Sequence, residues 1–314
     1  MYDQDRGWER DAITRLAEAS LREQRRSRNW GIFFKLLTFV YITAILLMIN
    51  DPFVMEPGSS SERHTALVNI NGLIADGEMA SADNVVTSLR NAFEDEATAG
   101  VIIRINSAGG TPVQAGYIYD EIKRLREKHP DTPLYAVISD MCASGGYYVA
   151  SAADKIFADK ASIVGSIGVR MDNFGFVEAM QKLGIERRTL TAGENKAIMD
   201  PFSPIDEAAR THMQSLLDDI HQQFITAVTE GRGDRLKTDA REIFSGLIWT
   251  GQQSLELGLV DELASSSQVA RDVIGEADII EYTVTEDLIE RLAGRVGASM
   301  AGVLHNRWTA PILD

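Results

Sequence analysis

The chain has 314 residues, of which 45% are hydrophobic and 25% are charged. This composition is ordinary for globular proteins and excludes a collagen-like or wholly disordered chain. The 46 acidic residues outnumber the 31 basic residues, and the formal net charge of −15 disfavours nucleic-acid binding, because phosphates attract a basic surface. The single cysteine, Cys142, excludes an intrachain disulfide and a cysteine-rich zinc site.

The first distinctive feature in chain order is a run at residues 30–49, in which 16 of the 20 residues are apolar. A helix of that length rises about 30 Å, which matches the hydrocarbon thickness of a bilayer. Arginines cluster before the run, and the first basic residue after it is Arg63. Because positive charge stays on the cytoplasmic side, residues 1–29 are predicted to be cytoplasmic and the remainder to lie outside.

A cleaved signal peptide and a buried soluble helix are the alternatives to an uncleaved anchor. The run is longer than the usual h-region of about 7–15 residues, and no A-x-A cleavage site follows it. A helix that is apolar on every side and adjoins four arginines is also unsuited to a soluble core. The sequence therefore favours a transmembrane anchor at residues 30–49.

The segments that flank the anchor differ in character. Residues 1–29 carry seven arginines and six acidic residues, with apolar residues at near-helical spacing, which fits an amphipathic helix at the membrane surface or a frayed tail. Residues 50–64 contain two prolines and several serines, which predicts a linker. The globular domain is expected at residues 65–285, and residues 286–314 form a C-terminal segment that serves as a subunit contact or as a flap over a substrate.

In the expected globular domain, short apolar runs alternate with amphipathic stretches. The expected strands are residues 66–74, 99–105, 134–138, 155–158, 163–164 and 186–190. The expected helices are residues 82–93, 113–128, 145–151, 176–183 and 206–229. This alternation predicts an α/β fold with a largely parallel sheet covered by helices.

Two glycine-rich segments follow expected strands. In the Asn-Ser-Ala-Gly-Gly segment at 106–110, the glycines allow the backbone to turn so that paired amides could hold an oxyanion, although a simple strand-to-helix turn would also use them. Ser144 stands between Ala143 and Gly145, where a crowded turn at the start of a helix can expose its hydroxyl. The structural alternative for Ser144 is a helix N-cap.

Lys196 and the histidines are the candidate general bases for such a serine. Lys196 is followed by three apolar residues, which could keep its amine neutral by excluding water, whereas most lysines are solvated. No histidine lies between Ser144 and His212. His129 falls at a polar helix end, and His212 and His221 fall on what is expected to be the solvated face of a helix. A Ser–Lys dyad therefore fits better than a Ser/His/Asp triad.

Taken together, these segments resemble the signal peptide peptidase A family of protease IV-like serine peptidases. The resemblance covers about residues 65–285 and rests on four motifs in order, at 106–110, 143–148, 164–169 and 193–201. It implies that residues 65–285 are a peptidase domain with the crotonase/Clp-protease type of β-α-β spiral. A single serine motif and a single lysine motif identify the short, single-domain form. One departure is Ala108, which stands where the family often has proline.

The resemblance also implies a role for each matched residue. Ser144 matches the nucleophile, Lys196 the general base and Ser166 the serine that orients the lysine. Gly110 and Gly145 match the residues whose amides form the oxyanion hole, and Gly109 is the alternative to Gly110. Whether Ser144 and Lys196 pair within one subunit or between two is left open, as is the number of subunits in the membrane ring that the family implies.

The expected function is that of a serine endopeptidase anchored in the bacterial inner membrane, with its N-terminus in the cytoplasm and its catalytic domain in the periplasm. It would cleave apolar peptides, such as signal-peptide remnants, through an acyl-enzyme, without a metal or another cofactor and without nucleic acid. Cys142 is expected to be a buried structural residue. The alternative functions are a non-catalytic membrane scaffold ring and an acyl-CoA enzyme of crotonase type.

Overall fold

The computed structural model describes residues 5–49, 62–237 and 240–285, and the chain divides into two compact units, Met1–Glu56 and Pro57–Asp314. The first unit contains one continuous helix, α1 (Asp5–Ile49), which runs through both the expected cytoplasmic segment and the expected anchor. Among the helices that the structure describes, none combines the length and the apolar character that a membrane span requires.

Several expected features of the chain fall beyond this described part. Part of the expected anchor lies outside the described structure, because the side chains of residues 44–49 are not among those described. Most of the expected linker, residues 50–61, and all of the expected C-terminal segment after residue 285 also lie outside it. The anchor, the linker and the C-terminal segment therefore stay predictions.

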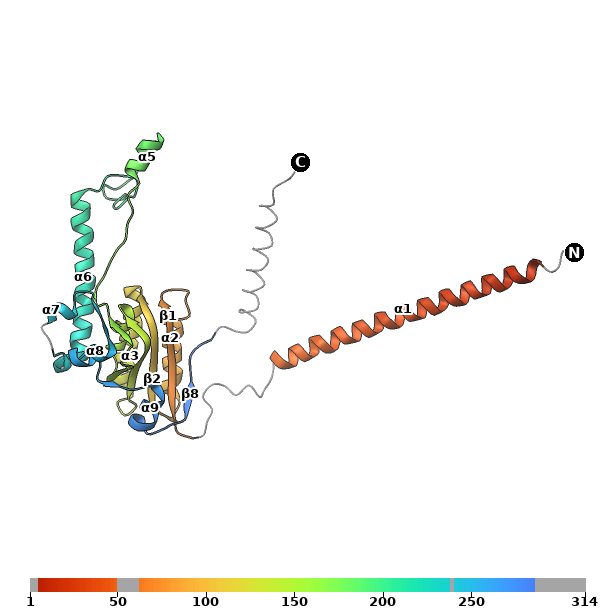
Figure 1. Ribbon diagram of the computed structural model, residues 1–314, viewed down its shortest axis with the longest axis horizontal. Coiled ribbons are helices and arrows are strands. Elements are labelled where there is room, and N and C mark those ends of the chain that lie inside the picture. The colour runs from red at the N-terminus through yellow and green to blue at the C-terminus, as the bar shows by residue number, and fades with distance from the viewer. Residues whose placement is uncertain (1–4, 50–61, 238–239, 286–314) are drawn as a thin grey trace. The chain divides into compact units, whose positions relative to one another are not determined.

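The second unit is built on an eight-stranded sheet with the strand order β6-β5-β3-β2-β1-β8, in which β4 pairs with β3 and with β7 (Figure 1). Every pair is parallel except the antiparallel pair of β5 and β6. This arrangement confirms the predicted α/β class and the largely parallel sheet. The strands are β1 (His64–Ile74), β2 (Thr98–Gly110), β3 (Leu134–Ala143), β4 (Lys155–Ala158), β5 (Ile163–Gly165), β6 (Ile248–Thr250), β7 (Glu262–Leu263) and β8 (Ile279–Glu281).

Two central strands are longer than the apolar runs that predicted them. β2 continues through its glycine pair because β1 stays paired with it as far as Ile74 and Gly110. β3 changes partner along its length, pairing with β4 up to Ile138 and with β5 from Met141 onward. Through these extensions, both glycine-rich segments begin at the end of the same sheet.

Helices cover the two faces of the sheet unequally. One face is covered by α2 (Ala82–Glu94), α3 (Pro112–Lys128) and α4 (Gly145–Ala150). The other carries only a small cluster of buried residues beside α9 (Ser266–Gln268) and the π-helix η2 (Val269–Ile274). The remaining elements are α5 (Val177–Leu183), α6 (Glu207–Arg232), η1 (Gly233–Arg235), α7 (Ala240–Ile243) and α8 (Gly251–Leu257).

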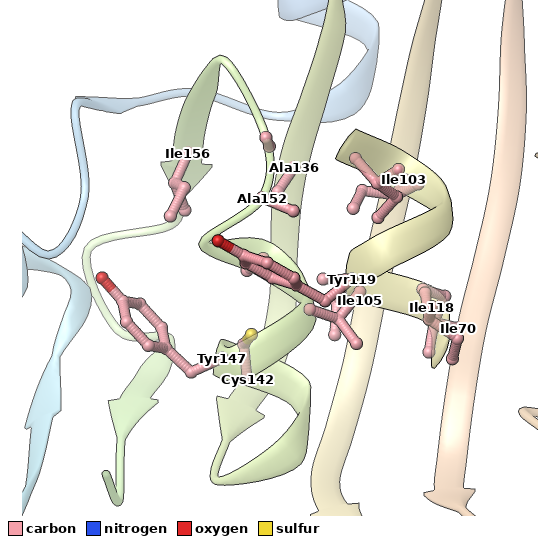
Figure 2. Close-up of a cluster of buried hydrophobic side chains, with 14 of the residues drawn as sticks. Ile70, Ile103, Ile105, Ile118, Tyr119, Ala136, Cys142, Tyr147, Ala152 and Ile156 are labelled. Atoms are coloured by element: carbon pink, nitrogen blue, oxygen red, sulfur yellow. The ribbon is translucent and has the colours of Figure 1, made fainter. Parts of the chain in front are cut away.

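The main core lies between the sheet and the helices α2, α3 and α4. Ile103 and Ile105, two residues apart on β2, point to the same face and pack with Ile118 and Tyr119 of α3 (Figure 2). On α3, residues three and four apart are buried together, which explains why this amphipathic sequence forms a helix here. Each fully buried aliphatic side chain contributes about 1.5–3 kcal/mol, so this core holds the strand ends in fixed positions.

Residues 170–205, which we call the arm segment, extend away from the sheet. α5 lies at the end of α6 that is remote from the sheet (Figure 1). The predicted strand at 186–190 is wrong, because these residues are exposed and irregular. A strand needs a neighbour to satisfy its backbone groups, and the hydrogen bonds described for the arm segment all stay within it.

Glu121 of α3 makes the fold sensitive to acid. The residue is 8% exposed, and its carboxylate accepts hydrogen bonds from Arg124 and Arg90, which lower its pKa from 4.5 to about 2. We expect Glu121→Gln to lower the free energy of unfolding at pH 7 by about 1–2 kcal/mol. Because the folded pKa lies below the unfolded value, this difference should disappear as the pH falls from about 4.5 to about 2.

Urea denaturation of both proteins across this pH range measures the difference. Glu127→Gln, at an exposed position of the same helix, is the matched control. A difference between wild type and Glu121→Gln that stayed constant with pH would contradict the assignment.

Candidate functional site

Ser144 occupies a sharp turn between the end of β3 and the start of α4. Its φ of 51° and ψ of −124° are rare for a residue with a side chain. Its amide donates to the Gly165 carbonyl at 2.9 Å, which ties the turn to the end of β5. The Ser144 side chain makes no capping hydrogen bond to α4, so the structure does not support the N-cap alternative. A strained strand–serine–helix turn is a known way of exposing a nucleophilic hydroxyl.

The glycines that end β2 lie directly against this turn. A Cβ atom on Gly109, whose φ is 107°, would lie 2.7 Å from the Cβ of Ser144, and a Cβ on Gly110 would collide with the carbonyl of Ile74. The place of a Cβ on Gly145 would be 3.2 Å from the amide nitrogen of Gly110. The two residues predicted as oxyanion donors, Gly110 and Gly145, are therefore neighbours beside the candidate nucleophile.

The two glycine amides of the 106–110 segment have different surroundings. The amide of Gly109 donates to the Ser107 hydroxyl at 3.1 Å, within the segment itself. Gly110 lines the cavity next to Ser144, and Gly109 is not among the residues that line it. This difference favours Gly110 over Gly109 as the donor to a bound group.

Ser166 forms a second sharp turn at the end of β5. Its φ is 53°, and its amide donates to the Leu247 carbonyl at 2.6 Å. The next residue, Ile167, offers its carbonyl to Nε2 of His221 at 3.3 Å, and because a carbonyl only accepts, the imidazole nitrogen must donate. His221 was expected on a solvated face, and this expectation is wrong because its ring is half-buried against the turn, whereas His212 is exposed as expected.

A cavity of about 1080 Å³ joins these elements. Ser144, Ser166, Gly110 and Gly145 all line it. Its wall is mixed: Val113, Tyr117, Tyr148, Val169, Ile220 and Phe224 lie beside the charged and polar residues Asp120, Arg170 and Gln223. Burial, with smaller contributions from Asp120 and Glu230, raises the pKa of the Tyr148 phenol. A cavity of this size can hold several residues of an extended peptide.

Lys196 does not belong to this cavity in the single chain. It lies in the arm segment between α5 and α6, and its side chain is exposed. Its backbone amide donates to the Gly193 carbonyl at 3.2 Å, but its amine makes no hydrogen bond or ion pair with any residue that the structure describes. The three apolar residues after it do not bury it. The structure thus brings together five of the six predicted site residues, Gly109, Gly110, Ser144, Gly145 and Ser166, and leaves the lysine elsewhere.

The end of the arm segment nevertheless has an internal structure of its own. Phe176 and Phe202 stack with ring centroids 5.6 Å apart, and the Arg187 guanidinium lies over the Phe202 ring. Arg187 also forms an ion pair with Asp200 and holds the pKa of that carboxyl at about 2. Lys196 is therefore carried by an ordered tip whose described polar contacts do not extend beyond the arm segment.

Cys142 is fully buried near the end of β3, two residues before Ser144. Burial raises the pKa of its thiol, which keeps the reactive thiolate form unpopulated. Its burial confirms that it is a structural residue.

Comparison with known proteins adds to this geometry. The sequence profile of peptidase family S49 matches residues 126–279, a range that includes Ser144, Ser166 and Lys196. A putative signal peptide peptidase SppA of Enterococcus faecium is 31% identical over 241 residues, which is 74% of this chain and 69% of that protein. A putative protease of Synechocystis is 32% identical over 243 residues, 75% of this chain and 85% of the relative.

A protein of Brucella abortus named Na⁺/H⁺ antiporter NhaA is 38% identical over 247 residues, which is 77% of this chain. The match covers only 32% of that protein, so the chain spans about a third of its length. The antiporter name describes that longer protein as a whole.

Proposed function

Because the chain belongs to peptidase family S49, we propose that it is a serine endopeptidase that hydrolyses peptides through an acyl-enzyme on Ser144. The observation that carries the proposal is the strained turn at Ser144, which opens on a large cavity beside the adjacent residues Gly110 and Gly145. This arrangement supplies a nucleophile, donors for a developing negative charge and space for a peptide.

The chemical steps follow from these roles. The Ser144 hydroxyl attacks the peptide carbonyl and transfers its proton to the neutral amine of Lys196. The oxyanion that forms accepts hydrogen bonds from the amides of Gly110 and Gly145. As the C–N bond breaks, Lys196 returns the proton to the leaving amine. A water molecule, deprotonated by the same lysine, then hydrolyses the acyl-enzyme and releases Ser144.

The position of Lys196 leads us to propose that the dyad forms between subunits of a homo-oligomeric ring. Lys196 is exposed on the arm segment, and the lysine-free cavity already contains Ser144 and Ser166. If the arm segment of one subunit enters the cavity of the next, the apolar and aromatic residues of its wall exclude water from the amine and favour its neutral form. Ser166 then orients the amine with its hydroxyl, without adding a charge that would keep the amine protonated.

The wider proposal places the enzyme in the bacterial inner membrane. Residues 30–49 form the anchor, residues 1–29 are cytoplasmic, and the catalytic domain, of the crotonase/Clp-protease spiral type, is periplasmic. The apolar run and the preceding arginines support this topology. Apolar peptides such as signal-peptide remnants are the proposed substrates, which the apolar and aromatic residues in the cavity wall and the name of the Enterococcus relative support.

Fluorophosphonate labelling of the full chain in detergent, together with hydrolysis of a quenched-fluorescent apolar peptide, tests the proposal. We expect the wild-type protein to be labelled and active, and Ser144→Ala to lose labelling and to lose roughly 10³-fold or more of its rate. Ser267→Ala, at an exposed serine of α9, serves as the control and should behave as wild type.

Two outcomes would instead support the alternative functions. A wild-type protein that is neither labelled nor active would favour the scaffold ring. Turnover of acyl-CoA that is insensitive to Ser144→Ala would favour the acyl-CoA enzyme.

A further inference from the structure

Ser107 lies at the point where β1 and β2 lose their regular register. The strands pair Asn71 with Asn106 and then Leu73 with Gly109, so that Gly72 faces the two residues 107 and 108. Gly72 has a φ of 84°, in the left-handed region that favours glycine. Ser107 fills the space created by this irregularity, and its side chain is only 2% exposed.

The Ser107 hydroxyl makes two hydrogen bonds with neighbouring backbone groups. It has one proton, and the shorter contact, 2.5 Å to the Gly72 carbonyl, identifies that carbonyl as its acceptor in preference to the Gly109 carbonyl at 3.4 Å. Its lone pair accepts the amide of Gly109 at 3.1 Å. The hydroxyl therefore connects β1 to the first of the two glycines that border the nucleophile.

From this geometry, and resting on the proposed function, we propose that Ser107 is a positioning residue for the oxyanion hole. By engaging the amide of Gly109, it sets the orientation of the peptide units that follow. The next amide, that of Gly110, is then the one that faces the cavity beside Gly145. Ser107 touches neither the substrate nor the reacting atoms, and it acts only through the glycine segment.

Without the hydroxyl, the Gly109 amide would lose its hydrogen bond to Ser107 inside a buried site. The segment would then rotate or fluctuate to find another partner, and Gly110 would leave the orientation that an oxyanion requires. Ground-state peptide binding depends on the cavity wall, which Ser107 does not form. The expected defect is therefore confined to the transition state and to compounds that mimic it.

The test compares Ser107→Ala with Ser88→Ala in the full chain. Ser88, on α2 outside the site, is the matched control because it is also buried and also both donates and accepts a hydrogen bond. Its hydroxyl donates to the Asn84 carbonyl at 2.7 Å and accepts from the Val284 amide at 2.9 Å. We expect Ser107→Ala to lower kcat by about 10–100-fold while KM changes by less than about twofold. Binding of a peptide aldehyde, which forms a tetrahedral adduct with Ser144, should weaken by a similar factor.

Ser107→Cys is the second variant, because it fills the site with a somewhat larger atom, so that no cavity forms, while replacing the hydroxyl with a weaker donor and acceptor. It should show the same selective defect even where the alanine variant folds poorly. A kcat and an aldehyde affinity that match those of Ser88→Ala in every Ser107 variant that folds would overturn the inference. So would a rise in KM that fully accounts for the loss of activity.

The inference and the proposed function fail in different ways. If Ser144→Ala retains activity, the proposed function is wrong. If Ser144→Ala is inactive while Ser107→Ala has normal kcat and aldehyde binding, only the role of Ser107 is wrong.

Discussion

Lys196→Ala and Ser144→Ala should each be inactive alone, and co-assembly of the two should restore about a quarter of the wild-type rate. In a head-to-tail ring, each site takes its serine from one subunit and its lysine from the next. Random mixing of equal amounts then places an intact serine opposite an intact lysine at about one interface in four. The exposed position of Lys196, outside the cavity that contains Ser144, is the structural reason for this expectation.

Co-expression of the two full-length variants with different affinity tags, followed by purification through both tags, provides the mixed assembly. Lys182→Ala, at an exposed lysine of the same arm segment, is the matched control and should remain active alone. Mixed assemblies that stay inactive would show that the dyad forms within one subunit. Activity of Lys196→Ala alone would remove the lysine from the mechanism.

Much of the fold could be predicted because it depends on local pattern. The apolar runs at 66–74 and 155–158 became β1 and β4 with bounds shifted by two residues at most, since a buried parallel strand requires apolar residues on both faces. The prediction of a strand at 186–190 was wrong because an apolar pattern alone does not make a strand. A strand also requires a partner, and whether residues 186–190 meet one is decided by distant parts of the chain.

The candidate site shows the same division. Glycines 109, 110 and 145 and Ser144 were predictable because small residues after a buried strand are needed wherever the backbone must approach a reacting group. The contacts of Ser107 and His221 were not predictable, because each depends on another segment, Gly72 in one case and Ile167 in the other. The sequence also carries no sign that Lys196 stands apart from Ser144, since that separation depends on the path of the arm segment.

The arm segment is the second place where a large effect is expected. The exposed fraction of Phe174 is 74%, and Leu190 is fully exposed. Leu183, Ile185 and Ile205 of the same segment are exposed as well. Apolar side chains concentrated on one projecting segment are unusual for a monomer and typical of an interface. We infer that a second copy of this chain covers them, because the same segment carries the lysine that the serine cavity lacks.

Replacing Phe174 and Leu190 with aspartate should therefore dissociate the ring and lower peptide hydrolysis by roughly 10²-fold or more, because the dyad is no longer assembled. The melting temperature of the sheet domain should change little, since neither side chain is buried in the described structure. Analytical ultracentrifugation in detergent measures the assembly, with Val273→Asp on η2, a partly exposed apolar residue outside the arm segment, as the control. A double variant that remains assembled but is inactive would contradict the role of these side chains in assembly and would place the defect inside the cavity. A dissociated and fully active protein would show that one subunit contains the complete dyad.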